Sequence, residues 1–374
     1  MTSMTQAGSP VPTHAPRPVA PRDSARVFIS GHSLTDNPLP DDLAAIAQSL
    51  GTPVRWNQQN VVGSQIKVRT RGDNPAVQGW PGYRSGKNRE GQGMDVVREL
   101  REPQTLGGER YDTLIIAENH VIIWSLTQAD TVRHLRHFHD RFIEGNSQGQ
   151  TYFYEAWLGI DNKSDPRDWI AYERAASPIW QCIATRINHS LAAEGRADRI
   201  ASLPAGAALA ELVERATQGP GVPGVSASSV RETVDRIVND DVHLTRLGVY
   251  YMALVTYAAV FNRSPQGAWA PDGVTSTQAK SLQEVAWAYV AAYSSQNTPL
   301  GLGQCRALMC DSFCNTYNTY RRSPHFNQEI WRWWSNVKRL RESAGCRWLF
   351  SRESQENPFY FSPDSDASYW YPAP

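Results

Sequence analysis

Three side chains in two short segments of the sequence have the types needed for acyl transfer. Ser33 lies in the segment GHSL, directly after the apolar run of residues 27–29. Asp240 and His243 lie far downstream, three residues apart in the segment DDVH. A serine hydroxyl becomes a nucleophile when a base removes its proton, and a third group must orient that base. The residue types therefore predict a serine nucleophile, an imidazole base and an orienting carboxylate.

The spacing in DDVH favours Asp240 over Asp241 as the orienting carboxylate. A tight turn can bring Asp240 to one imidazole nitrogen of His243 and leave the other nitrogen facing Ser33, whereas this spacing aims Asp241 elsewhere. The following residues, LTRLG, predict the start of a helix that fixes the turn against the domain. For each side chain taken alone, the alternative is a polar loop with satisfied hydrogen bonds.

The segments that must position these side chains alternate between strand-like and helix-like patterns from Val27 to about residue 264. This alternation is typical of a parallel sheet covered by helices, in which ligands bind beyond the carboxyl ends of the strands. Ser33 is expected at such an end. The expected strands are residues 26–29, 113–117, 151–156 and 199–203. The expected helices are residues 40–50, 168–191 and 247–261, with two more after residue 264, at 276–293 and 327–343.

The same segments resemble the sequence blocks of the SGNH, or GDSL-type, hydrolases over roughly residues 26–262. The first block of that family, Gly-Asp-Ser-Leu, appears here as GHSL, and the fifth block, Asp-x-x-His, appears as Asp240 to His243. The glycine of the second block best matches Gly63 in NVVGS. The third block, Gly-x-Asn-Asp, matches AENH, which contains Asn119.

This resemblance implies a fold and a set of roles. The fold would be a three-layer α/β/α, flavodoxin-like parallel sheet of the SGNH type with a C-terminal α-helical extension. Ser33 would attack an ester carbonyl, with His243 as base and then acid and Asp240 orienting it. The backbone N–H groups of Ser33 and Gly63 and the side-chain amide of Asn119 would hold the oxyanion. No metal or organic cofactor is implied, and no phosphate-binding glycine pattern predicts a nucleotide.

Four more residues could contact a substrate. His32 and His120 flank the expected site and replace aspartates of the resembled family, although both could simply bind nearby backbone. Trp157 follows an expected strand at the ligand-binding edge, and a place in the core is its alternative. Arg84 lies in the glycine-rich segment 78–92, whose length suggests an active-site loop or else a plain surface loop.

The segment RHLRHFHD contains three histidines and raises the question of a metal site. On a helix His134 and His137 share one face, but His139 points about 200° from His137, since each residue turns the chain by about 100°. A three-histidine site would therefore need a distorted helix. We expect no metal site and a solvated helical face instead.

The composition fits a globular protein without a strongly charged partner. The 374 residues include 37 basic and 37 acidic side chains, so no overall charge attracts nucleic acid or an anionic membrane. No apolar stretch approaches the roughly 18 residues of a membrane span. Residues 1–25 are expected to form a disordered leader, residues 26–265 the catalytic domain and residues 266–374 an aromatic-rich helical extension. The oligomeric state stays open.

Four of the five cysteines are close to the C-terminus, namely Cys305, Cys310, Cys314 and Cys346. Their spacing does not match a zinc site, and it fits buried thiols and disulfides equally well. Disulfides would indicate an oxidising compartment, so a periplasmic or secreted location is slightly favoured over the cytoplasm. The odd count leaves at least one thiol unpaired in a monomer.

These features together predict the hydrolysis of a carboxylic ester through an acyl-serine intermediate. The expected partner is a small-molecule or saccharide ester with a short acyl group such as acetyl, because the loops are aromatic and polar and lack a broad apolar run for a fatty chain. Two alternatives stay open. One is an O-acyltransferase that uses the same three residues, and the other is a non-catalytic carbohydrate-binding protein on the same fold.

Overall fold

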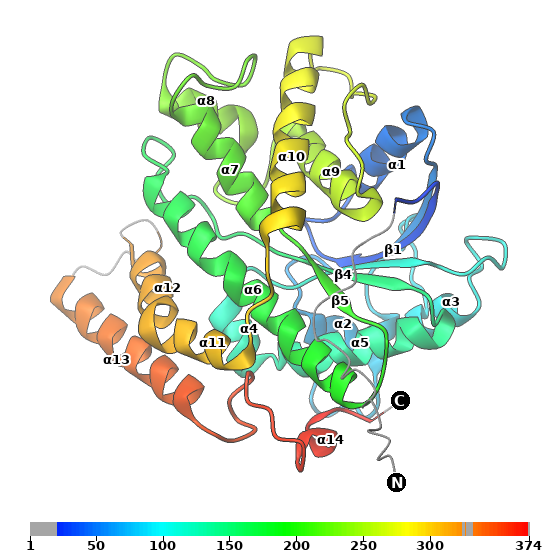
Figure 1. The fold of residues 1–374 in the computed structure, drawn as a ribbon, viewed down its shortest axis with the longest axis vertical. Helices are drawn as coiled ribbons and strands as arrows, with labels where there is room; N and C mark the ends of the chain where they lie inside the picture. The colour runs from blue at the N-terminus through cyan, green and yellow to red at the C-terminus, as the bar shows by residue number, and fades with distance from the viewer. Residues whose placement is uncertain (1–20, 324–325, 327–331, 373–374) are drawn as a thin grey trace, which may run out of the picture.

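A parallel five-stranded sheet forms the centre of the molecule, for which a computed structural model describes residues 21–323, 326 and 332–372 (Figure 1). The strands lie in the order β2-β1-β3-β4-β5, and every neighbouring pair is parallel. The order therefore reverses between β1 and β3, and ligands of such sheets bind beyond the carboxyl ends of the strands at this point. The strands are β1 (Ala25–Gly31), β2 (Val54–Asn60), β3 (Thr113–Ala117), β4 (Gln150–Tyr154) and β5 (Ile200–Leu203).

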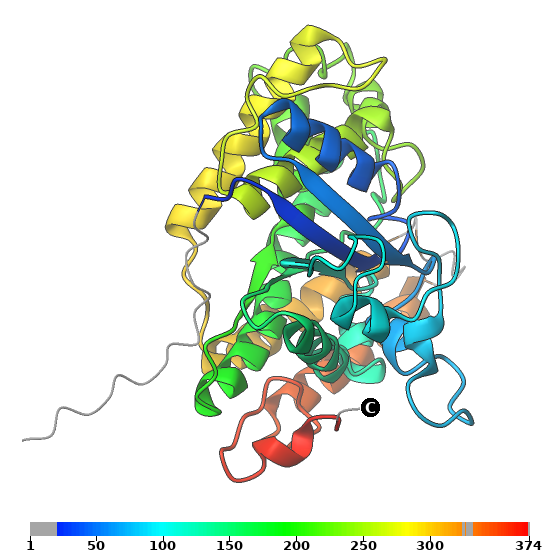
Figure 2. The ribbon, with the colours of Figure 1, turned by 90° about the vertical axis from the view of Figure 1, so that its right-hand side faces the viewer.

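Helices cover both faces of the sheet and produce a three-layer α/β/α arrangement (Figures 1 and 2). The upper layer in Figure 1 contains α1 (Leu39–Ser49), α7 (Ala205–Thr217), α9 (Arg246–Phe261) and α10 (Ser276–Gln296). The opposite layer contains α2 (Ile66–Thr70), α3 (Val96–Arg101) and α5 (Thr131–Gly145), and α6 (Arg167–Ala193) contacts α5, α7 and β5. Shorter elements are the 3-10 turn η1 (Pro81–Arg84), α4 (Ile122–Gln128) and α8 (Val230–Ile237).

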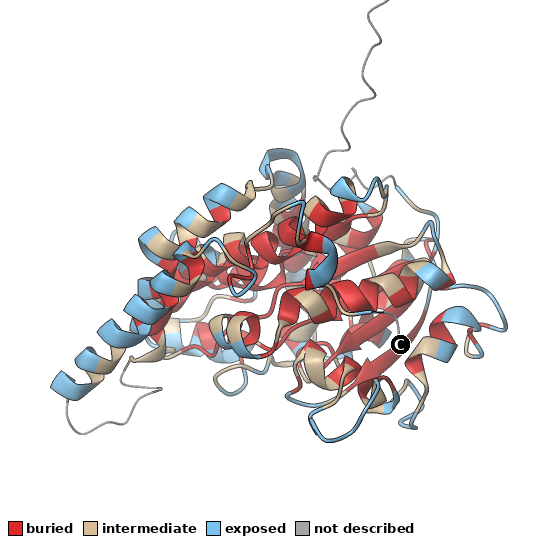
Figure 3. Ribbon diagram, turned by 90° about the horizontal axis from the view of Figure 1, so that it is seen from below, coloured by how far each residue is buried: buried red, intermediate tan, exposed pale blue. Residues whose placement is uncertain are grey.

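Apolar side chains fill the space between these layers. Every residue of β3, with the sequence TLIIA, is buried, as expected for a strand covered on both faces. Helix α9 is almost entirely buried because α1, α7, α8 and α10 all pack against it. Figure 3 shows the same distribution, with the sheet and the inner helix faces buried and the outer helix faces exposed. The strand ends that carry polar residues are thus held by a continuous core.

The structure confirms the expected strands with small shifts at their ends, but it adds β2, which was not expected. The sequence of β2, VRWNQQN, is too polar to show strand-like alternation. Gln59 is nevertheless buried, because its Nε2 donates hydrogen bonds to the backbone carbonyls of Arg69 and Gly82. The polar side chains of β2 therefore bind loop carbonyls where an ordinary buried strand would carry apolar side chains.

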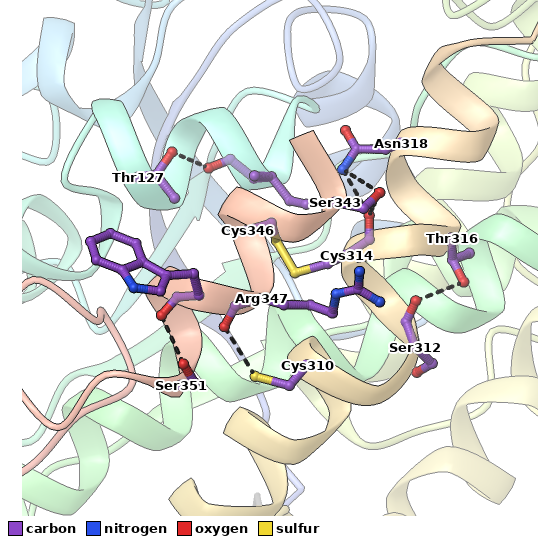
Figure 4. The surroundings of a disulfide bond; sticks show 12 residues. Thr127, Cys310, Ser312, Cys314, Thr316, Asn318, Ser343, Cys346, Arg347 and Ser351 are labelled. Carbon is purple, nitrogen blue, oxygen red and sulfur yellow. Dashed lines mark hydrogen bonds between the residues drawn. A yellow bond between two sulfur atoms is a disulfide. The ribbon is translucent and has the colours of Figure 1, made fainter. Parts of the chain in front are cut away.

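The C-terminal segment is attached to this domain by packing and by a disulfide. Helix α10 packs directly on α9, and α11 lies against α6, where the Cys182–Cys305 disulfide joins them. A second disulfide, Cys314–Cys346, joins α12 to α13 (Figure 4), and Cys310 is an unpaired thiol. The elements of this segment are α11 (Leu302–Leu308), the π-turn η2 (Met309–Phe313), α12 (Cys314–Arg321), α13 (Arg332–Ser351) and α14 (Asp366–Tyr369).

Both ends of the chain differ in part from what the sequence indicates. Most of the expected leader, residues 1–20, lies outside the described residues, but Ala25 already begins β1 and Arg22 donates a hydrogen bond to Thr113 at 2.7 Å. Of the expected helix at 327–343, residues 327–331 also lie outside the described residues, and the remainder belongs to α13. Within the described residues, no helix combines the length and apolarity needed to cross a membrane.

Candidate active site

Ser33, His243 and Asp240, together called the triad, form a continuous chain of contacts beyond the carboxyl end of β1. The Nε2 atom of His243 lies 3.0 Å from Oγ of Ser33. On the other side of the ring, Nδ1 lies 2.7 Å from Oδ2 of Asp240. A neutral imidazole that donates from Nδ1 to a carboxylate keeps an acceptor at Nε2. The arrangement therefore allows His243 to take the proton of the Ser33 hydroxyl.

The loop between α8 and α9, called the triad loop, holds the imidazole and its carboxylate together. The loop is closed by a hydrogen bond from the backbone N–H of Asn239 to the carbonyl of His243 at 2.8 Å. Oδ1 of Asp240 accepts backbone N–H bonds from Val242 and His243, at 2.8 and 2.6 Å. Partial burial works to raise the pKa of Asp240, but the hydrogen bonds from the backbone and ring of His243 and from Val242 lower it to about 2. Asp240 is therefore a carboxylate at neutral pH.

Asp241 lies in the same turn without contacting the imidazole. Its side chain lies beside Gly159, where a Cβ atom would approach Oδ2 of Asp241 to 3.0 Å. Its backbone carbonyl accepts a hydrogen bond from the N–H of Ile160 at 2.8 Å. The turn thus aims the two neighbouring carboxylates at different partners, and only Asp240 contacts His243 in the described structure.

The loop that carries Ser33 is tightly packed against the ends of two other strands. A Cβ atom at Gly31 would lie 1.8 Å from Oγ1 of Thr35, so only glycine fits there. The carbonyl of His32 accepts hydrogen bonds from the side-chain amide of Asn60 at 3.3 Å and from the N–H of Thr35 at 2.9 Å. These contacts set the height of Ser33 above the sheet.

His32, next to Ser33 in the chain, has its side chain in the core. Its Nε2 lies 3.0 Å from the carbonyl oxygen of Glu118, to which it donates. Burial first and the charge of Arg69 second lower the pKa of His32 to about 3. A neutral imidazole here joins the end of β1 to the end of β3. His32 thus binds nearby backbone, the alternative that the sequence left open beside contact with a substrate.

Three possible oxyanion donors converge from the ends of β1, β2 and β3. In the sheet Gly31 pairs with Asn60 and Ser30 with Ile116, so the loops that follow these strands start at one edge. Within the described residues, the backbone N–H groups of Ser33 and Gly63 have no hydrogen-bond acceptor.

The side-chain amide of Asn119 links two of these loops. Its Nδ2 donates one hydrogen bond to the carbonyl of Gly63 at 3.0 Å, and its Oδ1 accepts from the N–H of Val121 at 3.2 Å. An amide nitrogen carries two hydrogens, so one remains for a ligand. Gly63 itself has a φ of 69°, a left-handed conformation that favours glycine.

Glu118 joins the backbone of Asn119 to the start of α2, three residues after Gly63, and the sequence did not single it out. Its Oε1 accepts the N–H of Asn119 at 2.6 Å and the N–H of Ile66, the first residue of α2, at 3.2 Å. Its Oε2 accepts the hydroxyl of Thr131 at 2.6 Å. Glu118 is fully buried, and this burial raises its pKa while its hydrogen bonds oppose the shift. The sequence does contain one signal for Glu118, because an acidic residue directly follows the buried strand TLIIA at the ligand-binding edge of the sheet.

His120 lies near the imidazole of His243 and near the C-terminal segment. Burial, followed by the charges of Arg321 and His243, lowers the pKa of His120 to about 4, against the opposing charge of Asp241. A neutral His120 thus lies near groups from two other parts of the chain, α12 and the loop of Asp241 and His243. Of the four expected substrate contacts, it is the one whose surroundings include both the triad loop and α12.

Trp157 and Arg84 lie away from the open side of the triad. Trp157 is buried, and its Nε1 donates to the carbonyl of Val242 at 2.8 Å, so the ring supports the turn that carries His243. This place in the core is the alternative to stacking on a substrate. Arg84 pairs with Asp95 at 2.9 Å and lines a cavity with Trp80 and residues of α3, and none of its hydrogen bonds in the described structure reaches the triad.

The expectation of a solvated histidine face on α5 is wrong. His134, His137 and His139 are all buried, because α2 and η1 pack on one side of α5 and the sheet packs on another. Each ring binds a hydroxyl, with Nδ1 of the three rings 2.9, 2.8 and 2.8 Å from the oxygens of Thr70, Tyr83 and Thr151. Among the described residues, no group of three or more His, Cys, Asp or Glu side chains is arranged to hold a metal ion.

The sequence matches no protein-family model and no curated protein. A solved structure, the crystal structure of a DUF4886 family protein from Bacteroides uniformis, aligns with 74% of this chain and 98% of its own chain. The two sequences are 14% identical over this alignment, and the TM-score is 0.47. A similarity of this size assigns neither a family nor a function.

Proposed function

We propose that this protein is a serine hydrolase of the SGNH type that cleaves a carboxylic ester. The observation that carries the proposal is the contact chain from Ser33 through His243 to Asp240, at 3.0 and 2.7 Å. It lies where the strand order of the sheet reverses, a position that favours ligand binding. The triad side chains are also accessible, with 46% of the His243 side chain exposed, so a substrate and water can both reach them.

In the proposed first step, His243 accepts the proton of Ser33 as Oγ attacks the ester carbonyl carbon. Asp240 keeps Nδ1 protonated and stabilises the imidazolium that forms. The N–H groups of Ser33 and Gly63 and the second amide hydrogen of Asn119 would stabilise the negative charge on the carbonyl oxygen. Removal of one such donor typically costs about 3–4 kcal/mol of transition-state stabilisation.

In the second step, the tetrahedral intermediate collapses and the C–O bond to the alcohol breaks. His243 gives its proton to the departing alkoxide, which leaves an acyl group on Ser33. Water then attacks the acyl carbon while His243 accepts a proton from it, and collapse of the second intermediate releases the acid and restores the Ser33 hydroxyl. Over both steps, the reaction consumes one ester and one water and releases the alcohol and the acid.

We infer a short acyl group on a polar alcohol, such as a saccharide, as the substrate. The triad lies on an exposed, polar edge of the sheet, and this environment suits a polar alcohol better than a long hydrocarbon chain. The two disulfides support a periplasmic or secreted location, because such bonds persist in oxidising compartments.

The test is covalent labelling with a fluorophosphonate together with hydrolysis of p-nitrophenyl acetate. Wild-type protein should take up one equivalent of label and hydrolyse the ester, and Ser33→Ala should lose both while its melting temperature stays nearly unchanged. The matched control is Ser64→Ala, which removes another serine hydroxyl at the same edge of the sheet. Absence of label in wild-type protein, or near-wild-type turnover by Ser33→Ala, would contradict the proposal.

A further inference from the structure

A groove opens between α4 and the helices α12 and α13; no triad residue lines it in the described structure, but α4 follows directly on the loop that carries Asn119 and His120. The groove has a volume of about 600 Å³. Helix α4 begins at Ile122, two residues after His120, so one wall of the groove continues directly from the candidate oxyanion loop. The groove is lined by Trp124 and Thr127 from α4 and by Tyr317, Arg321 and Glu342 from the C-terminal segment, among others.

Hydrogen bonds connect the second wall of the groove to the triad. The hydroxyl of Tyr320, in α12, donates to the carbonyl of Gly159 at 2.7 Å and accepts the N–H of Asp161 at 3.1 Å. Between these two residues, the N–H of Ile160 binds the carbonyl of Asp241 in the triad loop at 2.8 Å. Helix α12 is therefore anchored on the segment that backs the triad loop, with Arg321 next to this anchor.

The groove walls are preformed. The Cys314–Cys346 disulfide joins α12 to α13, and Cys346 and Thr127 line the groove together (Figure 4). The side-chain amide of Asn318 reinforces the joint, since its Nδ2 lies 2.8 Å from the carbonyl of Cys314 and 3.3 Å from the hydroxyl of Ser343. A ligand would meet a rigid surface and would not have to order these helices.

The charge in the groove is unbalanced. Arg322 pairs with Glu342 at 2.5 Å, whereas Arg321 has no carboxylate within ion-pairing distance in the part of the chain that the structure describes. The guanidinium of Arg321 lies 5.5 Å from the centre of the Phe326 ring, a contact that positions it without neutralising it. The guanidinium also donates a hydrogen bond to the hydroxyl of Tyr317, and its remaining N–H donors match a carboxylate in a two-point contact.

The opposite wall offers a flat apolar surface. The side chain of Trp124 is 45% exposed, although it lies in a groove and on a short helix at the edge of the core. An indole ring presents both an apolar face and one N–H donor, which suits the mixed surface of a sugar ring. The groove thus offers a cationic side chain, Arg321, to an anionic group of a ligand and an indole face, Trp124, to a sugar ring.

We propose that this groove binds the alcohol half of the ester and selects a saccharide that carries a carboxylate. Arg321 is the specificity-determining residue that pairs with this carboxylate, and Trp124 packs on the sugar ring. The proposal rests on the proposed ester hydrolysis and names its substrate class. It assigns to the C-terminal segment a role in substrate selection.

The experiment compares two substrates that differ in one charge, mono-O-acetyl glucuronic acid and mono-O-acetyl glucuronamide. Wild-type protein should show a KM about 10-fold or more lower for the acid, because only the acid offers Arg321 a charged two-point contact. Arg321→Gln should raise the KM for the acid until it equals that for the amide, so that the ratio of the two KM values falls to about 1. Arg321→Lys should restore part of the preference, since it keeps the charge but not the two-point contact.

The matched control is Arg98→Gln, which removes an exposed arginine of α3 that lines a different cavity and should change neither KM. Equal KM values for the two esters in wild-type protein, or an unchanged preference in Arg321→Gln with an unchanged melting temperature, would overturn the groove proposal and leave ester hydrolysis standing. If wild-type protein hydrolyses neither ester and takes up no label at Ser33, the proposed function fails and the groove proposal fails with it. If Arg321→Gln does not fold, the Arg321→Lys comparison decides.

Discussion

At the scale of single residues, the site depends on which of two adjacent carboxylates reaches the imidazole. Asp240 accepts two backbone N–H bonds through Oδ1 and contacts Nδ1 of His243 through Oδ2. Asp241 faces Gly159 instead. The two residues are chemically identical, so any difference between their variants reports the geometry of the turn.

Asp240→Asn should lower kcat/KM on p-nitrophenyl acetate at least about 100-fold, and Asp241→Asn less than about 3-fold. An amide at position 240 can still accept the backbone N–H bonds, but it presents N–H to Nδ1 of His243. The proton of the ring then moves to Nε2, and the base that faces Ser33 is lost. Steady-state kinetics of the two variants make the comparison. A larger loss in Asp241→Asn would show that the wrong carboxylate has been assigned.

At the scale of elements, the triad loop depends on a neighbouring segment that takes no direct part in the chemistry. Trp157 donates to the carbonyl of Val242, one residue before His243. The N–H of Ile160 donates to the carbonyl of Asp241. Further back, Tyr320 of α12 binds Gly159. The position of the imidazole therefore depends on hydrogen bonds from residues 157–160, which are in turn bound by Tyr320 of the C-terminal segment.

Trp157→Phe should lower kcat by about 10-fold as well as the melting temperature, because it removes the hydrogen bond that holds the Val242 carbonyl. Loss of a partner for one buried polar group costs about 1–3 kcal/mol. The matched control is Trp180→Phe, since Trp180 of α6 is equally buried but packs on the Phe153 ring of β4, with ring centroids 5.8 Å apart, and makes no hydrogen bond to residues 157–160 or the triad loop among the described residues. It should lose stability without losing kcat. Equal effects of the two variants on kcat would refute the positioning role of Trp157.

At the scale of the whole molecule, the fold buries several histidines in the neutral form. Burial is the largest cause in each case, and it lowers the pKa of His32 and His134 to about 3 and that of His137 to about 4. In the unfolded chain a histidine has a pKa of about 6.5. Below that pH the unfolded state binds protons that the folded state does not, so each of these histidines makes the free energy of unfolding fall as the pH decreases.

The buried Glu155 and Glu173 act in the opposite direction, because burial raises their pKa values and protons then favour the folded state. Comparison with His134→Gln isolates the contribution of one histidine. Between pH 7 and pH 5, the free energy of unfolding of wild-type protein should fall by about 2 kcal/mol relative to that of the variant. Urea unfolding at the two pH values measures this difference. A difference that does not change with pH would mean that His134 has the same pKa in the folded and the unfolded protein.

The sequence by itself determined the elements and the residues whose roles depend on their near neighbours. Strand β3 was predicted because TLIIA is apolar throughout, and Ser33 was singled out because GHSL follows an apolar run. The contact between Asp240 and His243 was predicted from their spacing, because a turn of four residues brings them together whatever the rest of the chain does.

Only the tertiary structure decided which residues support the site and what lies beside it. Strand β2 was missed because its buried Gln59 side chain binds the backbone carbonyls of residues 10 and 23 positions further along the chain. The faces of α5 were misjudged because burial of His134 depends on Thr70 of α2. Trp157 likewise gains its place from Val242, a partner far along the chain. Local patterns report the periodicity and turns of a segment, whereas burial and charge balance depend on what the rest of the fold packs against it.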